Sequence, residues 1–155
     1  MLARTENSDR LDQLEQQIRN SSAPTIELFS DVIAECPRLF ALVRSGRAPQ
    51  LDQSLRAGAW VDAALGTITL GMPTMSIRRL VYDDGEWFCS LTRQRHLPAE
   101  LDDTVDARHE CLPLAILAAF LEARQQAASL RTDPTRSVPH VGRQQEIPVI
   151  CENFA

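Results

Sequence analysis

The feature that most constrains the fold is a predicted β-hairpin in the middle of the chain. Residues 76–93 contain two runs rich in β-branched and aromatic side chains, separated by Asp84-Gly85. An Asp-Gly pair between such runs is the strongest local signal for a two-residue hairpin turn, because both turn residues need positive φ. Since a lone two-stranded sheet is not stable in water, this hairpin must pack against other elements. The sequence therefore predicts a sheet that is covered by the remainder of the chain.

The turn also predicts the register of the hairpin. A type I′ turn at Asp84-Gly85 pairs three sets of residues: Tyr82 with Trp87, Leu80 with Cys89, and Arg78 with Leu91. The expected buried face then carries Leu80, Tyr82, Trp87, Cys89 and Leu91. The alternative is a type I turn with Gly85 in a bulge, which sets Tyr82 opposite Glu86. In the first register the opposite face holds Ile77, Val81 and Phe88, so the sheet is expected to need cover on both sides.

Helical spacing of apolar residues predicts helices before and after the hairpin. We expect one helix at 8–20 and a second at 25–43, broken near Pro37 because proline lacks the amide donor of the helical ladder. A third is expected at 59–69, although 67–70 also alternates like a strand. After a polar loop at 96–104, the segment 106–129 reads as helical, and its well-formed part should begin near Leu112, since Pro113 fits only a first turn.

These elements predict an α+β fold in which an antiparallel β-hairpin packs against helices. We expect three parts: an N-terminal helical extension at 1–50, a core of helix, hairpin and helix at 51–130, and an irregular proline-rich tail at 131–155. Four residues rule out long regular elements in the tail: Pro134, Pro139, Gly142 and Pro148. A short apolar stretch, Ile147-Pro148-Val149-Ile150-Cys151, follows near its end.

The middle of the chain resembles a known type of domain. The segment "DAAL" at 62–65, the hairpin, and "LPLAILAAFLEAR" at 112–124 follow in the order found in the small α/β sandwich domain of phage-related bacterial proteins. The blocks "RRLVYDDGEW" and "LPLAILAAFLEAR" are also similar to those of small proteins from GC-rich soil bacteria. The resemblance covers about residues 59–124 and consists of packing residues. It implies a fold and a phage-related bacterial setting, and it implies no site residues.

Composition limits the classes of partner. The net charge is −5 at pH 7, and non-specific attraction to nucleic acid or anionic lipid requires a cationic surface. All 16 basic residues are arginines; we attribute this to GC-rich codons, because the arginines are scattered among acids as on a solvated surface. No apolar run is long enough for a membrane span, and the first residues lack the apolar core of a secretory signal. We therefore expect a cytoplasmic protein that binds neither membrane nor nucleic acid.

The four cysteines, Cys36, Cys89, Cys111 and Cys151, are too widely spaced for a secreted disulfide framework. We expect four reduced thiols, with Cys36 and Cys89 acting as small core side chains.

Known catalytic and ligand-binding motifs are missing from the sequence. There is no phosphate-binding loop, nucleophile elbow or Cys-x-x-Cys pair. Cys89, His96, His109 and Cys111 have the residue types of a zinc site, but their spacing is irregular. Cys89 or Cys111 with His109 has the residue types of a nucleophile and base, and Asp83-Asp84 and Asp102-Asp103 suit turns better than catalysis. We therefore predict no catalytic residue, no metal ligand and no cofactor.

One local excess of basic side chains lies on the hairpin and just after it. Arg78, Arg79, Arg93 and Arg95 form a candidate interaction surface, because guanidinium groups bind phosphates and carboxylates. The alternative is that they pair with Asp83, Asp84, Glu86 and Asp102 at the end of the sheet. We expect a non-enzymatic protein that binds another macromolecule, most simply a protein partner or a second copy of itself. The other hypotheses are an acidic dimer like a secretion chaperone and a nucleic-acid-binding module that uses the hairpin arginines.

Overall fold

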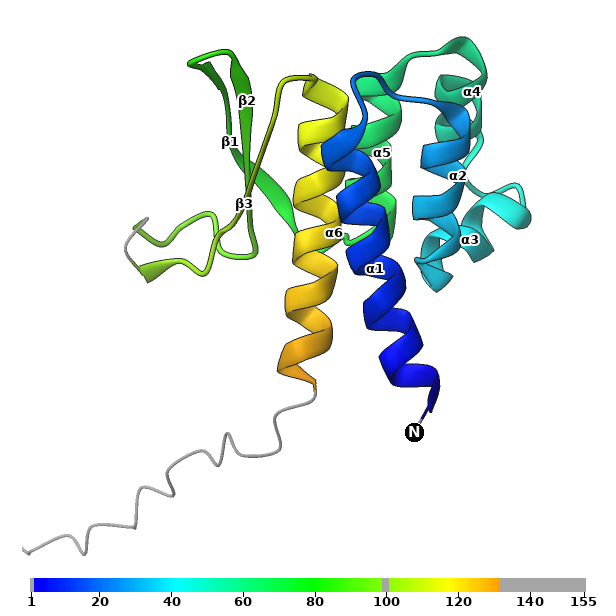
Figure 1. Cartoon of the computed structure of the whole chain (residues 1–155), viewed down its shortest axis with the longest axis horizontal. Coiled ribbons are helices and arrows are strands. Elements are labelled where there is room, and N and C mark those ends of the chain that lie inside the picture. The colour runs from blue at the N-terminus through cyan, green and yellow to red at the C-terminus, as the bar shows by residue number, and fades with distance from the viewer. Residues whose placement is uncertain (1, 99–100, 132–155) are drawn as a thin grey trace, which may run out of the picture.

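The computed structural model describes residues 2–98 and 101–131 (Figure 1). The elements are α1 (Leu2–Asn20), α2 (Ile26–Ala34), α3 (Pro37–Arg44), α4 (Pro49–Ala57), α5 (Trp60–Gly71), β1 (Ser76–Asp83), β2 (Glu86–Thr92), β3 (Val105–His109) and α6 (Leu112–Leu130). The three strands form one antiparallel sheet in the order β1-β2-β3. This arrangement confirms the predicted α+β class.

The hairpin turn is the predicted one. Asp84 and Gly85 both have positive φ, 52° and 85°, as a type I′ turn requires. Tyr82 pairs with Trp87 and Leu80 with Cys89, which confirms this part of the predicted register. The alternative with Tyr82 opposite Glu86 is wrong, because Glu86 pairs with Asp83.

The register changes at Arg78. Leu91 pairs with Ile77 instead of Arg78, and the irregularity lies between Ile77 and Arg79. One extra residue in β1 turns Ile77 toward the core face, where it packs against the hydrophobic cluster. The predicted pairing of Arg78 with Leu91 is therefore wrong, because the bulge frees Arg78 to reach a polar partner outside the ladder.

A third strand, β3, occupies part of a segment that was predicted to be helical. Val105, Ala107 and His109 face the core side of the sheet, opposite Leu91, Cys89 and Trp87, while Asp106 and Arg108 face the other way. This alternation is a strand pattern, but it is only five residues long and follows directly on a loop. The predicted start of the helix near Leu112 is confirmed.

Helices cover only one face of the sheet. In Figure 1 all of them lie on the same side, and α6 is the helix that packs against β2 and β3. Cys89, Leu91 and Val105 are buried on this face, but Tyr82, near the turn, is 58% exposed. The prediction that Tyr82 is buried is therefore wrong, because the turn end of the hairpin extends away from the helices (Figure 1). The sheet was also expected to be covered on both faces, and this expectation is wrong as far as the described helices are concerned, because they all lie on one face.

The helix α6 is the centre of the fold. It contacts β2 and β3 on one side and α1 and α5 on the other, so most of its first twelve residues are buried: Pro113, Leu114, Ala115, Ile116, Leu117, Ala119, Phe120, Leu121 and Ala123. Gly71 at the end of α5 allows the closest approach. A Cβ atom there would lie 2.9 Å from the Phe120 ring, so only glycine fits without a shift.

The N-terminal helices belong to the same hydrophobic core. Leu11, Leu14 and Ile18 of α1 are buried, and together with residues of α2, α3 and α4 they join one cluster with the sheet and α6. Residues 1–50 and 51–130 thus share a core. Helix α2 begins after the Thr25 cap, whose side chain accepts a hydrogen bond from the Leu28 amide.

The predicted break at Pro37 is confirmed, because α2 ends at Ala34 and Pro37 begins α3. The helix predicted at 59–69 is also confirmed as α5, whereas α4 had no separate prediction. The predicted tail, with Cys151 and the apolar stretch at 147–151, lies outside the described residues.

Candidate functional site

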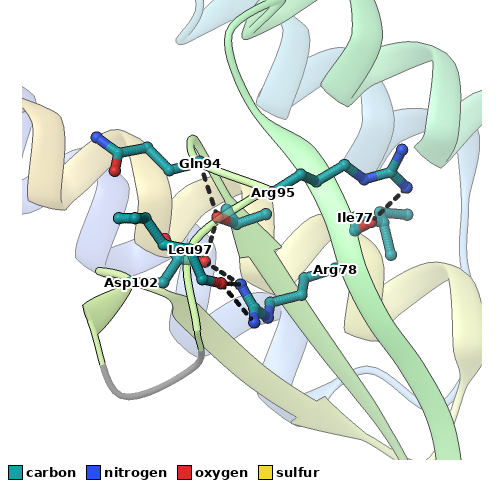
Figure 2. A network of polar contacts seen from close by, with 7 residues as sticks. Ile77, Arg78, Gln94, Arg95, Leu97 and Asp102 are labelled. Carbon is teal, nitrogen blue, oxygen red and sulfur yellow. Dashed lines mark hydrogen bonds and ion pairs between the residues drawn. The ribbon is translucent and has the colours of Figure 1, made fainter.

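The four hairpin arginines lie in different environments rather than in one patch. Figure 2 shows that Arg78 and Arg95 both turn back onto the protein. Arg78 forms an ion pair with Asp102, and both of its terminal nitrogens donate to the Leu97 carbonyl at 3.1 Å. Arg95 donates to the Ile77 carbonyl at 3.2 Å. Arg79 lies on the sheet, and Arg93 is exposed.

The contacts of Arg78 form a network that fastens the loop after β2. The Asp102 side chain is only 1% exposed and accepts hydrogen bonds from Arg78 and from the Thr92 hydroxyl. The Thr92 oxygen in turn accepts from the Gln94 amide at 3.0 Å (Figure 2). A buried carboxylate is tolerated only when it is paired and hydrogen-bonded. Arg78 therefore has a structural role, as the alternative of ion pairing with Asp102 predicted.

Arg79 belongs to the sheet face on which the described part of the chain places no helix. This open face consists of Arg79 and Val81 of β1, Phe88 of β2, and Asp106 and Arg108 of β3, which face the same way in the observed register. The Phe88 ring is half-buried, and the Arg79 and Arg108 guanidinium carbons lie 5.9 and 5.2 Å from its centre. Both distances are within the range of a cation–π contact. The sequence analysis noted Arg79 but missed Arg108, which the unpredicted strand β3 brings opposite Phe88.

A cavity of 290 Å³ lies between α1, α6 and β3. Its lining combines acids, bases and a histidine with three apolar side chains: Glu15, Ile18, Arg19, Asp106, Ala107, Arg108, His109, Ala118 and Glu122. Glu15 of α1 and Glu122 of α6 share a side-chain hydrogen bond. Sequence reasoning missed this pair, whose only signal was a charged residue within the apolar stretch of α6.

The two carboxyl groups change the acidity of Glu15. Partial burial, followed by the hydrogen bond to Glu122 and the charge of Glu122, raises the pKa of Glu15 from 4.5 to about 7. The charge of Asp12 adds to this rise, and the Arg19 guanidinium opposes it. A proton shared between the two carboxyls can thus hold α1 against α6 near neutral pH, since the unprotonated pair would repel.

The histidine and cysteine side chains have structural contacts. The Nδ1 atom of His109 accepts from the Cys111 amide at 2.9 Å, so its Nε2 atom carries the proton and donates to the Ile18 carbonyl at 3.0 Å. Cys36, Cys89 and Cys111 are free, and Cys36 and Cys89 are fully buried as predicted. Burial and the charge of Asp106 raise the pKa of the Cys89 thiol to about 12, so the thiolate needed for nucleophilic attack does not form at neutral pH.

The described geometry also bears on metal binding and on membrane spanning. Across the described part of the chain, no three His, Cys, Asp or Glu side chains come together as metal ligands would. Within residues 2–98 and 101–131, each helix is too short or too polar to cross a membrane.

Comparison with known proteins does not assign the chain to a family. No protein-family model, curated protein or solved structure matches the chain. The resemblance to the α/β sandwich domain of phage-related proteins therefore stays a prediction.

Proposed function

We propose that this chain is a non-enzymatic protein-binding module whose open face is the docking surface. The observation that carries the proposal is the half-buried Phe88 ring between Arg79 and Arg108, on a sheet face that none of the described helices covers (Figure 1). Aromatic and arginine side chains dominate the energetics of protein interfaces. A partner that covers this face would bury the ring and could give the two guanidinium groups carboxylate or carbonyl acceptors.

The charge around the ring favours a protein over a nucleic acid. The open face contributes two arginines, but Asp83, Glu86 and Asp106 lie on the same side of the sheet. Two cations among three anions do not form the basic surface that phosphate binding requires. The two hairpin arginines with internal contacts, Arg78 and Arg95, weaken the nucleic-acid hypothesis further.

The proposal is tested by photo-crosslinking in the cells that make the protein. A photoreactive amino acid at the exposed position 106 of β3 should give discrete higher-mass adducts with another protein, and Phe88→Ala or Arg108→Ala should remove them. The control places the same group at the exposed Gln53 on α4. Absence of adducts from position 106, or adducts that persist in both variants, would contradict the proposal.

Nucleic-acid binding is tested separately by fluorescence anisotropy at about 150 mM salt, where exposed charges more than about 8 Å apart are largely screened. Affinity tighter than about 1 μM for an oligonucleotide, lost in the Arg79→Ala/Arg108→Ala variant, would favour the nucleic-acid hypothesis instead.

A further inference from the structure

The outer edge of β1 is a free sheet edge of limited length. Among the described residues, β1 pairs with β2 and with no other strand. One end of the free edge is the bulge at Arg78. Next to it, the Arg95 side chain donates a hydrogen bond to the Ile77 carbonyl. The other end is the Asp84-Gly85 turn. Five residues, 79–83, are left as regular exposed edge.

The hairpin register determines which backbone groups point outward from this edge. Asp83 and Glu86 flank the two-residue turn, and such a flanking pair is hydrogen-bonded through its backbone. From this pair onward along an antiparallel ladder, pairs with and without backbone hydrogen bonds alternate. Asp83, Val81 and Arg79 therefore direct their backbone groups toward β2. The amides and carbonyls of Leu80 and Tyr82 point toward the free edge, and no described hydrogen bond outside the hairpin reaches them. Unpaired groups in this position are a template for another strand.

The side chains of this segment are complementary to themselves when the direction is reversed. If a second β1 pairs antiparallel about a two-fold axis at Val81, Arg79 lies opposite the second copy's Asp83, and Leu80 lies opposite its Tyr82. Opposite charges and apolar pairs directly across an antiparallel ladder are stabilising. The same axis places Leu80 and Tyr82 in hydrogen-bonded pairs, so that all four outward groups of each copy find partners.

We propose that the chain forms a two-fold homodimer by antiparallel pairing of β1 with β1 of a second copy, which joins the two sheets into one. The pairing also covers Tyr82, the side chain that is 58% exposed in the single copy. It uses the edge of the sheet, whereas the protein-binding proposal uses the open face, so either can fail alone. A contact of five residues per chain is short, so the dimer is expected to be weak and to depend on concentration.

The first test exchanges charges between two variants. Arg79→Asp and Asp83→Arg each place like charges opposite one another in a homodimer, so each variant alone should be monomeric. In an equal mixture, the aspartate at position 79 faces the arginine at position 83, and the mixture should dimerise. Sedimentation velocity from about 10 μM to about 1 mM follows the association of each sample, a range that covers weak complexes.

Matched controls change the same charges elsewhere. Arg93→Asp and Asp103→Arg are exposed substitutions outside the five-residue edge and should dimerise as the wild type does. A wild type that stays monomeric at about 1 mM, single variants that still dimerise, or a mixture that stays monomeric would each overturn the proposal.

The second test determines the register by disulfide trapping with diamide as the oxidant. The two copies of position 81 form a non-hydrogen-bonded pair with Cα atoms about 4.5 Å apart, within the range of a disulfide. Two copies of position 79 lie four residues out of register, roughly 13 Å apart. Val81→Cys should therefore give a reducible dimer and Arg79→Cys should not. Equal crosslinking at both positions, or none at position 81, would overturn the two-fold axis at Val81.

Discussion

The two faces of the sheet differ in how they are stabilised. On the face under α6, Cys89, Leu91 and Val105 are removed from water and packed against helix side chains. On the open face, Phe88 is only half-buried, and two exposed arginines lie beside its ring. In β2 the face under α6 carries Trp87, Cys89 and Leu91, whereas the other face carries Phe88 together with the polar residues Glu86, Ser90 and Thr92. Aromatic Phe88 is therefore less buried than the smaller Cys89 on the other face of the same strand, because the helices pack on one face.

The largest expected effect comes from truncating one side chain on each face. Leu91→Ala removes a fully buried side chain and should lower the free energy of unfolding by about 3 kcal/mol. Phe88→Ala on the open face should lower it by only about 1 kcal/mol, because the side chain is only half-buried and its cation–π contacts are made by exposed arginines. Urea denaturation of both variants measures the two losses. Equal losses would show that the open face is part of the core.

The loop after β2 covers part of the open side of the sheet, and a change in the Arg78 network tests how much this cover contributes to stability. Ser90 and Thr92 are buried there, next to the loop that holds Asp102. Arg78→Ala leaves the buried Asp102 carboxylate without its cation and should cost about 3 kcal/mol of unfolding free energy. Arg78→Lys should cost less than Arg78→Ala, because lysine keeps the positive charge and loses only the two contacts to the Leu97 carbonyl. Arg93→Ala is the matched control and should change stability by less than about 0.5 kcal/mol; an equal loss there would rule out a specific network.

Two glycines of α5 test how tightly the helical side is packed. Gly71→Ala brings a Cβ atom to 2.9 Å from the Phe120 ring and should destabilise by about 2 kcal/mol. At Gly66 the nearest atom would be Leu51 Cδ1 at 3.5 Å, an ordinary contact, so Gly66→Ala should stabilise the helix by roughly 0.5–1 kcal/mol. Thermal unfolding compares the two variants. A Gly71→Ala protein as stable as the wild type would show that α5 and α6 are less closely packed than the structure indicates.

The smallest expected effect is a pH dependence of the contact between α1 and α6. The pKa of Glu15 is raised from 4.5 to about 7 in the folded protein, so the folded state holds more protons than the unfolded state between these values. Protonated Glu15 therefore stabilises the folded protein fully below about pH 4.5, and this stabilisation is lost as pH rises through about 7. Above that pH, the titration of Glu15 no longer changes the stability. Asp12, Arg19 and Glu122 modify this titration.

Glu15→Gln removes the titrating group, so the difference in urea midpoint between wild type and variant should shift in favour of the variant as pH rises from 4.5 to 7. A difference that does not change with pH would contradict the shared proton. The same measurement on Glu86→Gln, on the open side of the sheet, provides the comparison.

Several elements could be predicted because their signals are local. The Asp84-Gly85 turn needs positive φ at two residues, and Pro37 breaks a helix through its own ring and missing amide. Cys36 and Cys89 were correctly placed in the core by their positions on apolar stripes. The bulge at Arg78 could not be predicted in this way, since it depends on Asp102, which lies 24 residues further along the chain. Strand β3 was missed because five alternating residues are stable as a strand only beside β2.

The candidate site residues also divide into those with a local sequence signal and those that depend on distant contacts. The sequence indicated a basic excess at Arg78, Arg79, Arg93 and Arg95, but contacts with distant residues decided that Arg78 and Arg95 bind the protein itself. The open face needed Arg108 from β3, and the cavity needed Glu15 from α1 and Glu122 from α6, which lie far apart in the chain. Neither set has a sequence motif, because its members meet only when α1, α6 and β3 pack together.

The sequence by itself determined the α+β class, the hairpin turn and its first pairs, and the positions of most helices. These follow from backbone preferences and from apolar periodicity, which act over a few residues. Only the tertiary structure decided that Tyr82 is exposed, that Arg78 leaves the ladder and that the helices within residues 2–98 and 101–131 leave one sheet face uncovered. Those outcomes depend on where α6 begins relative to the hairpin turn and on which charges find buried partners, and both are set by contacts between residues far apart in the chain.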